Sequence, residues 1–316
     1  LRQALDAHDR RANKNPPADD EQKQQRHGER ERIYLYLAQV HMGREQYEQA
    51  LTALERSGET GAAIAMVHAL RAQAHWQREE YDAAFSALNR GAERFPEDHR
   101  FLRRKVFYLI NLGFYRQAAD LGRDYLQKAD AGPEDYVAIG SALRQSEQHQ
   151  AALTLLERAH LIWPRERDIA VELAHTWLGL DKVGAAAEVF ARASVYHPAM
   201  RLEAAELQRR AGHLYRALML NTTVPDPAKK YRQRLAILVA MEHWDQAAGM
   251  GDALRRQGLL DNDDLRYAFA YALFKAGDYD RADQVLSGIQ DSETFRKATE
   301  LRKAMEKCRE AEWQCL

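Results

Sequence analysis

The chain has 316 residues and a formal net charge of −1, from 46 Lys plus Arg against 47 Asp plus Glu. This balance excludes a chain-wide electrostatic field that would attract nucleic acid or an anionic membrane, so any charged site must be local. Hydrophobic residues make up 46% of the sequence, with only 8 Pro and 17 Gly, which is typical of a helical protein. No apolar run approaches the roughly 20 residues that span a bilayer.

Residues 1–30 are predicted to form a helix followed by a polar loop. The stretch LRQALDAHDRRANK at 1–14 has a helical pattern but no partner helix, as expected for the second half of an earlier repeat. The stretch NPPADDEQKQQRHGER at 15–30 is almost entirely polar. Because such a segment buries little apolar surface, a loop or disorder is predicted there.

Residues 31–290 contain a pattern that returns every 34 residues. Five alanines mark the register: Ala50, Ala84, Ala118, Ala152 and Ala186. Large apolar residues stand four positions after four of these alanines: Leu54, Leu88, Leu156 and Phe190. Prolines stand twelve positions after three of them: Pro96, Pro164 and Pro198. Each unit is therefore predicted to be a hairpin of two amphipathic helices, in which small residues allow a close crossing and proline ends the second helix.

Further units follow around Ala217, Ala247 and Ala282, with small departures from the 34-residue pattern. Ala217 comes 31 residues after Ala186, so the first helix of that unit is predicted to be short. About eight units and about sixteen paired helices are expected in total, with no sheet. Residues 291–316 are predicted to be a capping helix with a polar outer face and a tail.

This period and pattern resemble the tetratricopeptide repeat family, over most of the chain from about Glu31 to Ile289. The resemblance implies an all-α, right-handed superhelical solenoid of antiparallel hairpins. It also implies a concave wall, made by the first helix of each unit, that holds an extended peptide or a partner helix.

Helical geometry selects the residues that face this wall. They are Trp76, Arg100, Arg103, Phe107, Arg144, His175, Tyr267, Tyr271 and Phe274. Arginine beside aromatic residues is typical of interface hot spots, so we expect a protein partner with an acidic segment and an apolar anchor. We also expect Arg103→Ala with Phe107→Ala to weaken partner capture and leave thermal stability nearly intact. In the alternative interpretation, the aromatic rings fill the groove floor and the arginines are merely solvated.

The Lys and Asn that some family members use to hold a chaperone's terminal carboxylate are not found at successive inward positions. Leu35 and Gln39, or Arg103 and Phe107, stand there instead. A chaperone-tail adaptor is therefore not expected.

No catalytic, phosphate-binding or metal-ligand motif is recognisable, so no enzymatic activity, cofactor or metal is expected. Histidines such as His41, His68 and His75 fall on helix-packing positions. Cys308 and Cys315 lie seven residues apart, which fits neither a redox pair nor a zinc site. They are either two separate thiols, compatible with the cytoplasm, or a disulfide that requires an oxidising compartment such as a bacterial periplasm.

Two functions are compatible with this sequence. The favoured hypothesis is a scaffold that assembles a multi-protein complex, including a complex of a bacterial cell envelope for secretion, pilus assembly or exopolysaccharide export. The alternative is a regulatory sensor, in which a bound peptide or glycan switches a partner. No direct insertion into a membrane is expected, and no nucleic-acid partner.

Overall fold

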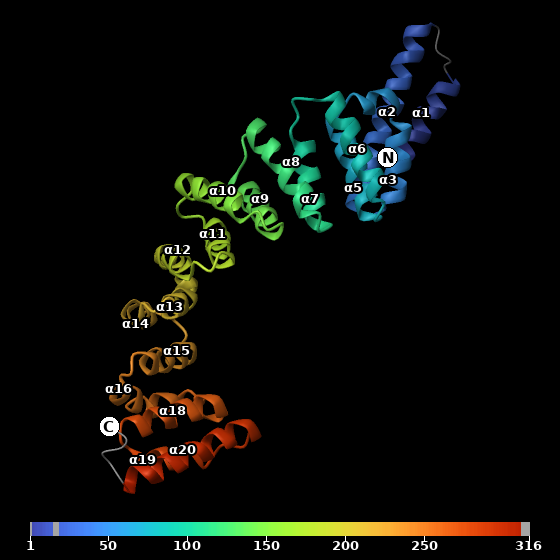
Figure 1. Cartoon of the computed structure of the whole chain (residues 1–316). Coiled ribbons are helices and arrows are strands. Elements are labelled where there is room, and N and C mark those ends of the chain that lie inside the picture. Colours follow the sequence, from blue (N-terminus) through green and yellow to red (C-terminus); the bar gives the residue numbers. More distant parts are fainter. Residues whose placement is uncertain (1, 15–18, 311–316) are drawn as a thin grey trace. The chain divides into compact units, whose positions relative to one another are not determined.

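The structure is a computed structural model that describes residues 2–14 and 19–310. Within these residues all regular secondary structure is helical, and no strand is present. The helices follow one another as packed hairpins, so the chain is an all-α solenoid, as predicted (Figure 1). It divides into two compact units, Leu1–Glu147 and Gln148–Leu316.

The first unit contains nine α-helices among its described residues. They are α1 (Arg2–Lys14), α2 (Asp20–Gly43), α3 (Tyr47–Arg56), α4 (Gly58–Ala62), α5 (Ala65–Gln77), α6 (Tyr81–Arg94), α7 (Arg100–Asn111), α8 (Tyr115–Lys128) and α9 (Pro133–Gln145). Helices α2 and α3, α5 and α6, and α7 and α8 form hairpins. The second helix of the first hairpin is broken at Ser57, and α4 continues it.

The second unit continues the same arrangement up to residue 310. Its elements are α10 (His149–Ile162), α11 (Arg167–Gly179), α12 (Val183–Tyr196), η1 (Pro198–Met200), α13 (Arg201–Arg210), α14 (Leu214–Thr222), α15 (Pro227–Ala240), α16 (Trp244–Ala248), α17 (Gly251–Arg256), η2 (Leu259–Asp261), α18 (Asp263–Lys275), α19 (Tyr279–Leu286) and α20 (Ser292–Glu310). Helix α13 has 10 residues against 13 in α11, so the predicted shortening falls on the first helix of this hairpin.

The repeating alanines all lie on the second helix of their repeat. All eight are fully buried, at 0% exposure: Ala50, Ala84, Ala118, Ala152, Ala186, Ala217, Ala247 and Ala282. In four repeats a small residue stands seven positions after the alanine: Ser57, Gly91, Ala159 and Ala193. A Cβ on Gly91, for example, would overlap the ring of Phe101, so the ring occupies the space that a larger side chain would need. The register predicted from the sequence is confirmed.

A residue in the left-handed region ends the first helix of every hairpin. The residues at this position have φ between 57° and 82°: Glu45, Glu79, Gly113, Glu147, Asp181, Gly212, Glu242 and Gly277. In most hairpins the next residue donates its backbone N–H to a carbonyl five positions back, as Glu80 does to His75 at 2.9 Å. This bond satisfies a carbonyl at the helix end and turns the chain into the second helix.

The loop predicted for residues 15–30 is wrong from Asp20 onward, where α2 begins. The side chain of Asp19 accepts a hydrogen bond from the backbone N–H of Gln22 at 2.7 Å and caps the helix. Residues 20–30 are polar, but Glu, Gln, Lys and Arg are good helix formers. Helix α1 is also not alone, because Leu5 packs against the core cluster that includes Tyr34 of α2. Residues 15–18 lie outside the described part.

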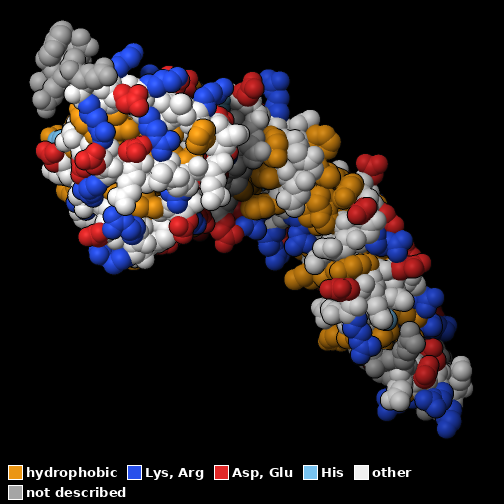
Figure 2. Space-filling view, turned by 90° about the horizontal axis from the view of Figure 1, so that it is seen from below, with side chains coloured by type: hydrophobic (Ala, Val, Ile, Leu, Met, Phe, Trp, Pro, Cys, Tyr) orange, Lys and Arg blue, Asp and Glu red, His pale blue; other side chains and the backbone are white. Residues whose placement is uncertain are grey.

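Charges of both signs are interspersed on the face of the molecule seen in Figure 2, and exposed hydrophobic side chains lie among them. This distribution agrees with the small net charge of the sequence. Recognition sites must therefore be identified from local groups of residues.

Candidate functional site

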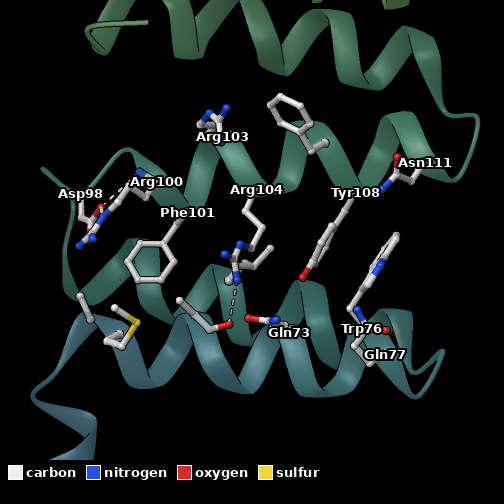
Figure 3. Close-up of a pocket in the computed structure, with 15 residues that line it drawn as sticks. Gln73, Trp76, Gln77, Asp98, Arg100, Phe101, Arg103, Arg104, Tyr108 and Asn111 are labelled. Atoms are coloured by element: carbon white, nitrogen blue, oxygen red, sulfur yellow. Dashed lines mark hydrogen bonds and ion pairs between the residues drawn. The ribbon is translucent and has the colours of Figure 1, made fainter. Parts of the chain in front are cut away.

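A pocket of about 470 Å³ lies between α5 and α7, the first helices of two consecutive hairpins (Figure 3). Four of the predicted wall residues line it: Trp76, Arg100, Arg103 and Phe107. The remaining lining includes Met66, Gln73 and Gln77 from α5, and Arg104, Tyr108 and Asn111 from α7. The role of these four residues in binding a partner stays a prediction.

Two aromatic rings form one side of the pocket. Trp76 stacks on Tyr108 with their centroids 3.8 Å apart and their planes inclined by 14°. Tyr81 lies against the same indole at 4.9 Å. Burial raises the pKa of Tyr108, whose ring contributes to the hydrophobic core. Tyr108 was not predicted as a groove residue, because it follows Phe107 and lies on the packed side of α7. Trp76 is thus held as a rigid apolar surface.

Arg104 connects the two helices beneath the pocket. Its guanidinium donates a hydrogen bond from Nη1 to the backbone oxygen of Ala69 on α5 at 3.2 Å, drawn as a dashed line in Figure 3. This hydrogen bond lies within the chain, so it holds α5 and α7 at a fixed spacing even when no ligand is bound.

Arg100 stands at the rim and is already paired. Its Nε and Nη2 donate to the two carboxylate oxygens of Asp98 at 2.7 and 2.6 Å. These hydrogen bonds hold the pKa of Asp98 below its ordinary value. The side chain of Arg100 is nevertheless 74% exposed, so an incoming carboxylate can reach it.

Arg103 points from α7 away from α5 (Figure 3). Its Nε donates to Oδ1 of Asp135 on α9 at 2.6 Å, and its Nη2 donates to Glu134 at 3.2 Å. The guanidinium also lies 4.6 Å from the ring centroid of Phe107. Burial alone would lower the pKa of Arg103, but the hydrogen bond and charge of Asp135 raise it above its ordinary value.

These contacts argue against the expectation that Arg103→Ala with Phe107→Ala would leave thermal stability nearly intact. Asp135 is a buried carboxylate that also accepts hydrogen bonds from the Tyr125 hydroxyl at 3.2 Å and the Gly132 N–H at 3.1 Å. Arg103 is its only charged partner among the hydrogen bonds of the described residues. Removing the guanidinium leaves a buried charge without compensation.

Three carboxamides line the pocket beside the aromatic rings: Gln73, Gln77 and Asn111. Within the described part of the chain none of them has a hydrogen-bond partner. A carboxamide both donates and accepts, so it can pair with the N–H or the C=O of a peptide backbone. Gln77 and Asn111 were missed by sequence reasoning, because they stand at helix ends where the inward direction is hard to assign.

The other predicted wall residues are not part of this pocket. Arg144 lies on α9 and does not line it. His175 is exposed on α11, with its ring 6.5 Å from that of Phe190. Tyr271 and Phe274 on α18 belong to a second aromatic cluster with Trp244 and Tyr279, at centroid distances of 5.8 to 6.3 Å. Tyr267 packs against the same core.

Other kinds of site are not found in the described residues. No group of three or more His, Cys, Asp and Glu side chains there is arranged to hold a metal ion. None of the helices between residues 2 and 310 combines the length and apolarity needed to cross a membrane. Cys308 is buried on α20, whereas Cys315 lies outside the described residues, so their pairing remains a prediction.

Comparison with known proteins identifies the fold. No protein-family model matches the chain, and no curated protein matches it in sequence. A structure described as "Structure of Naa15/Naa10 bound to HypK-THB" aligns at 15% identity with a TM-score of 0.53, over 85% of this chain and 45% of that chain. This chain thus spans less than half the length of that matched chain.

Two smaller solved structures align over part of the chain. PilW, described as a "widely conserved type IV pilus biogenesis factor", aligns at 16% identity with a TM-score of 0.46, over 61% of this chain and 91% of that one. YrrB, described as "a TPR protein with an unusual peptide-binding site", aligns at 15% identity with a TM-score of 0.45, over 54% and 90%.

At such identities, likeness to solved structures identifies only a fold. The 34-residue register, the buried alanines and the repeated hairpins are all present in this chain. The chain therefore has the tetratricopeptide-repeat fold that its sequence indicates.

Proposed function

We propose that this chain is a protein-interaction scaffold that holds a segment of a partner protein in the pocket between α5 and α7. The observation that carries the proposal is the lining of the pocket, in which the stacked Trp76 and Tyr108 lie beside three carboxamides that have no hydrogen-bond partner among the described residues. Apolar surface next to groups that can pair with a peptide backbone is suited to an extended segment.

The proposed segment has an apolar anchor and an acidic residue. Its anchor contacts Trp76 and Met66, whose side chain is 49% exposed. Its backbone pairs with Gln73, Gln77 and Asn111. Its carboxylate competes with Asp98 for Arg100, which is more exposed than Arg103. Arg103 supports the wall through Asp135 and contributes positive charge.

Site-specific photo-crosslinking in the native cell tests this proposal. A photoreactive phenylalanine analogue is placed at Met66 or Asn111 inside the pocket, and at Phe114 outside it as a matched exposed control. We expect one partner to be crosslinked from positions 66 and 111 and not from 114. With the purified partner, Met66→Glu is expected to weaken binding by about tenfold, because it buries a charge against the aromatic rings.

Met66 is exposed, so the melting temperature of Met66→Glu should match that of the wild type. Equal crosslinking from positions 66 and 114 would contradict the proposal. Crosslinking from Tyr271 alone would instead place the partner on the aromatic cluster of α18.

We further propose that the scaffold serves a bacterial envelope complex. This finer proposal depends on the two cysteines, because a Cys308–Cys315 disulfide requires an oxidising compartment. Intact-mass measurement of unreduced protein from its native source tests it. A bridged pair has two hydrogens fewer than two thiols, and two freely alkylated cysteines would contradict an envelope location.

A further inference from the structure

Exposed apolar residues gather at the C-terminal ends of α10 and α12. Leu161 and Ile162 end α10 at 83% and 50% exposure, and Val195 and Tyr196 end α12 at 70% and 52%. These four residues, named here the α10–α12 patch, occupy the same two positions of consecutive repeats, 34 residues apart. Side chains as exposed as these contribute little to the hydrophobic core, so core packing does not explain their apolar character.

The same two positions are polar in the neighbouring repeats. Glu93 and Arg94 occupy them on α6, and Gln127 and Lys128 occupy them on α8. The fold therefore accepts charged residues there without difficulty. Because only α10 and α12 carry apolar pairs at these positions, the pairs indicate a local contact surface.

Contacts between the segments that follow the two helices show that the pairs are neighbours. The guanidinium of Arg165, just after α10, lies 4.9 Å from the ring centroid of Tyr196 on α12. His197 Nε2 lies 2.7 Å from the backbone oxygen of Arg165. Burial and the charge of Arg192 lower the pKa of His160. The four apolar residues thus form one surface.

Three arginines surround the α10–α12 patch. Arg158 and Arg192 stand three and four positions before the apolar residues of their own helices, so they lie on the same helix face. Arg165 completes the group. In the described part of the chain, none of the three is paired with a carboxylate, in contrast to Arg100 and Arg103 at the pocket.

From this contrast we infer that the α10–α12 patch is a second docking surface, which binds an amphipathic acidic segment of a partner protein. The apolar face of the segment covers Leu161, Ile162, Val195 and Tyr196, and its carboxylates pair with Arg158, Arg165 and Arg192. Guanidinium groups bind carboxylates through two parallel hydrogen bonds, and apolar contact beside them excludes water.

The charges distinguish this occupant from two others. A symmetric contact between two copies of the chain would place both sets of three arginines in one interface, where like charges repel. An anionic bilayer presents negative charge everywhere, so it would also meet Glu157 and Glu166, which lie between the arginines in sequence. A protein segment can place its carboxylates opposite the guanidiniums alone.

The test uses the full chain and three synthetic helical peptides in a fluorescence anisotropy titration. The first peptide has leucines along one face with flanking glutamates, the second has lysines in place of the glutamates, and the third has serines in place of the leucines. We expect the first peptide to bind at least about tenfold more tightly than either of the others.

Matched variants locate the binding. We expect each of two double variants to weaken binding of the acidic peptide by about tenfold. The first is Arg158→Ser with Arg192→Ser, and the second is Leu161→Ser with Val195→Ser. Arg90→Ser is the control, because Arg90 occupies the same repeat position on α6 beside polar residues. Thermal melting verifies that every variant is folded. The proposal fails if the acidic and basic peptides bind equally, or if the control variant loses as much binding as the others.

Two further measurements separate the other occupants. Binding to phosphatidylglycerol vesicles that disappears in Leu161→Ser with Val195→Ser, without binding of the acidic peptide, would overturn the proposal in favour of a membrane surface. A dimer in sedimentation velocity that dissociates in the same variant would overturn it in favour of a second copy. These outcomes are independent of the pocket between α5 and α7.

Discussion

Arg103 on α7 and Asp135 on α9 are 32 residues apart in sequence, yet Nε of the arginine lies 2.6 Å from Oδ1 of the aspartate. The pair joins α7 to α9, the first helices of two consecutive repeats. The side chain of Asp135 is 6% exposed and that of Arg103 is 39% exposed, so the carboxylate is the buried partner. The pair therefore supports the wall beside the pocket.

Arg103→Ala is expected to destabilise the chain by about 3 kcal/mol. Loss of one partner of a buried pair leaves an uncompensated charge and typically costs about 3 to 5 kcal/mol. Because Arg103 is partly exposed, the lower end of this range is expected. Urea denaturation followed by circular dichroism measures it. The double variant Arg103→Ala with Asp135→Asn should recover part of the loss, and an additive loss would contradict the pairing.

The left-handed turn residues provide a matched pair of substitutions. Glu79 has φ of 59°, a conformation that strains a residue with a Cβ, so Glu79→Gly is expected to stabilise by about 0.5 to 1 kcal/mol. Gly113 has φ of 78° at the same position of the next repeat, and a Cβ there would meet no atom within 4 Å. Gly113→Ala should therefore destabilise through the backbone alone. Shifts of the same sign in the two denaturation midpoints would refute this interpretation.

The buried alanines define the closest helix crossings. Ala84→Leu and Ala186→Leu are each expected to cost about 1 to 3 kcal/mol, because three additional carbon atoms must enter a site with no free space. Ala236→Leu, at an exposed position of α15, is the control and should change stability by less than about 0.5 kcal/mol. Thermal denaturation of the three variants provides the comparison.

The repeated units could be predicted from the sequence because each hairpin repeats the same local packing. The alanine spacing alone identified buried positions as far as Ala282. The third hairpin shows the limit of this reasoning. Gly122 replaces the large residue four positions after Ala118, and a Cβ on it would lie 2.7 Å from Ile139. Tyr125 supplies the missing volume and reaches Asp135, a contact that no period predicts.

The helix face that Trp76 and Arg100 occupy was predictable from the sequence, but the charge pairing around the pocket was not. Helical geometry placed Trp76 and Arg100 on one wall, since their directions depend only on the register. The partners of the arginines are Asp98 in a loop and Asp135 at the start of the next hairpin. Pairing of this kind depends on loop geometry and on contacts between hairpins, so the sequence could not show that these charges are compensated.

Glu31 makes the stability of the first unit dependent on pH. This buried carboxylate accepts hydrogen bonds from the backbone N–H of Thr60 at 3.2 Å and from its hydroxyl, and His27 lies 3.2 Å away. Burial would raise the pKa of Glu31, but the bonds from Thr60 and the charge of His27 lower it below the ordinary value of 4.5.

A carboxyl group with a lowered pKa in the folded state stabilises fully above its unfolded pKa, and this contribution is lost as the pH falls through the folded value. Stability should therefore decrease below about pH 4.5, and Glu31→Gln should show a smaller decrease between pH 6 and pH 3. The urea denaturation midpoints of the wild type and of Glu31→Gln are compared at pH 6 and pH 3. Identical pH profiles would exclude the role assigned to Glu31.

Asn221 supports the irregular sixth hairpin. It is fully buried at the end of α14, and its amide donates to the backbone oxygen of Lys230 at 3.0 Å and to Oε1 of Gln233 at 3.1 Å. Gln233 in turn donates to the backbone oxygen of Leu202 on α13 at 2.8 Å, so the network links three helices. Asn221→Ala removes the donor to Oε1 of the buried Gln233 and is expected to cost about 1 to 3 kcal/mol. Thr222→Ala, at the exposed neighbouring position, should have a much smaller effect.

Hydrogen exchange measured on α13, α14 and α15 provides a second readout, because loss of the network should increase exchange there and leave α18 unchanged. Equal midpoints for the two variants, with unchanged exchange in α14, would show that helix packing alone holds this hairpin.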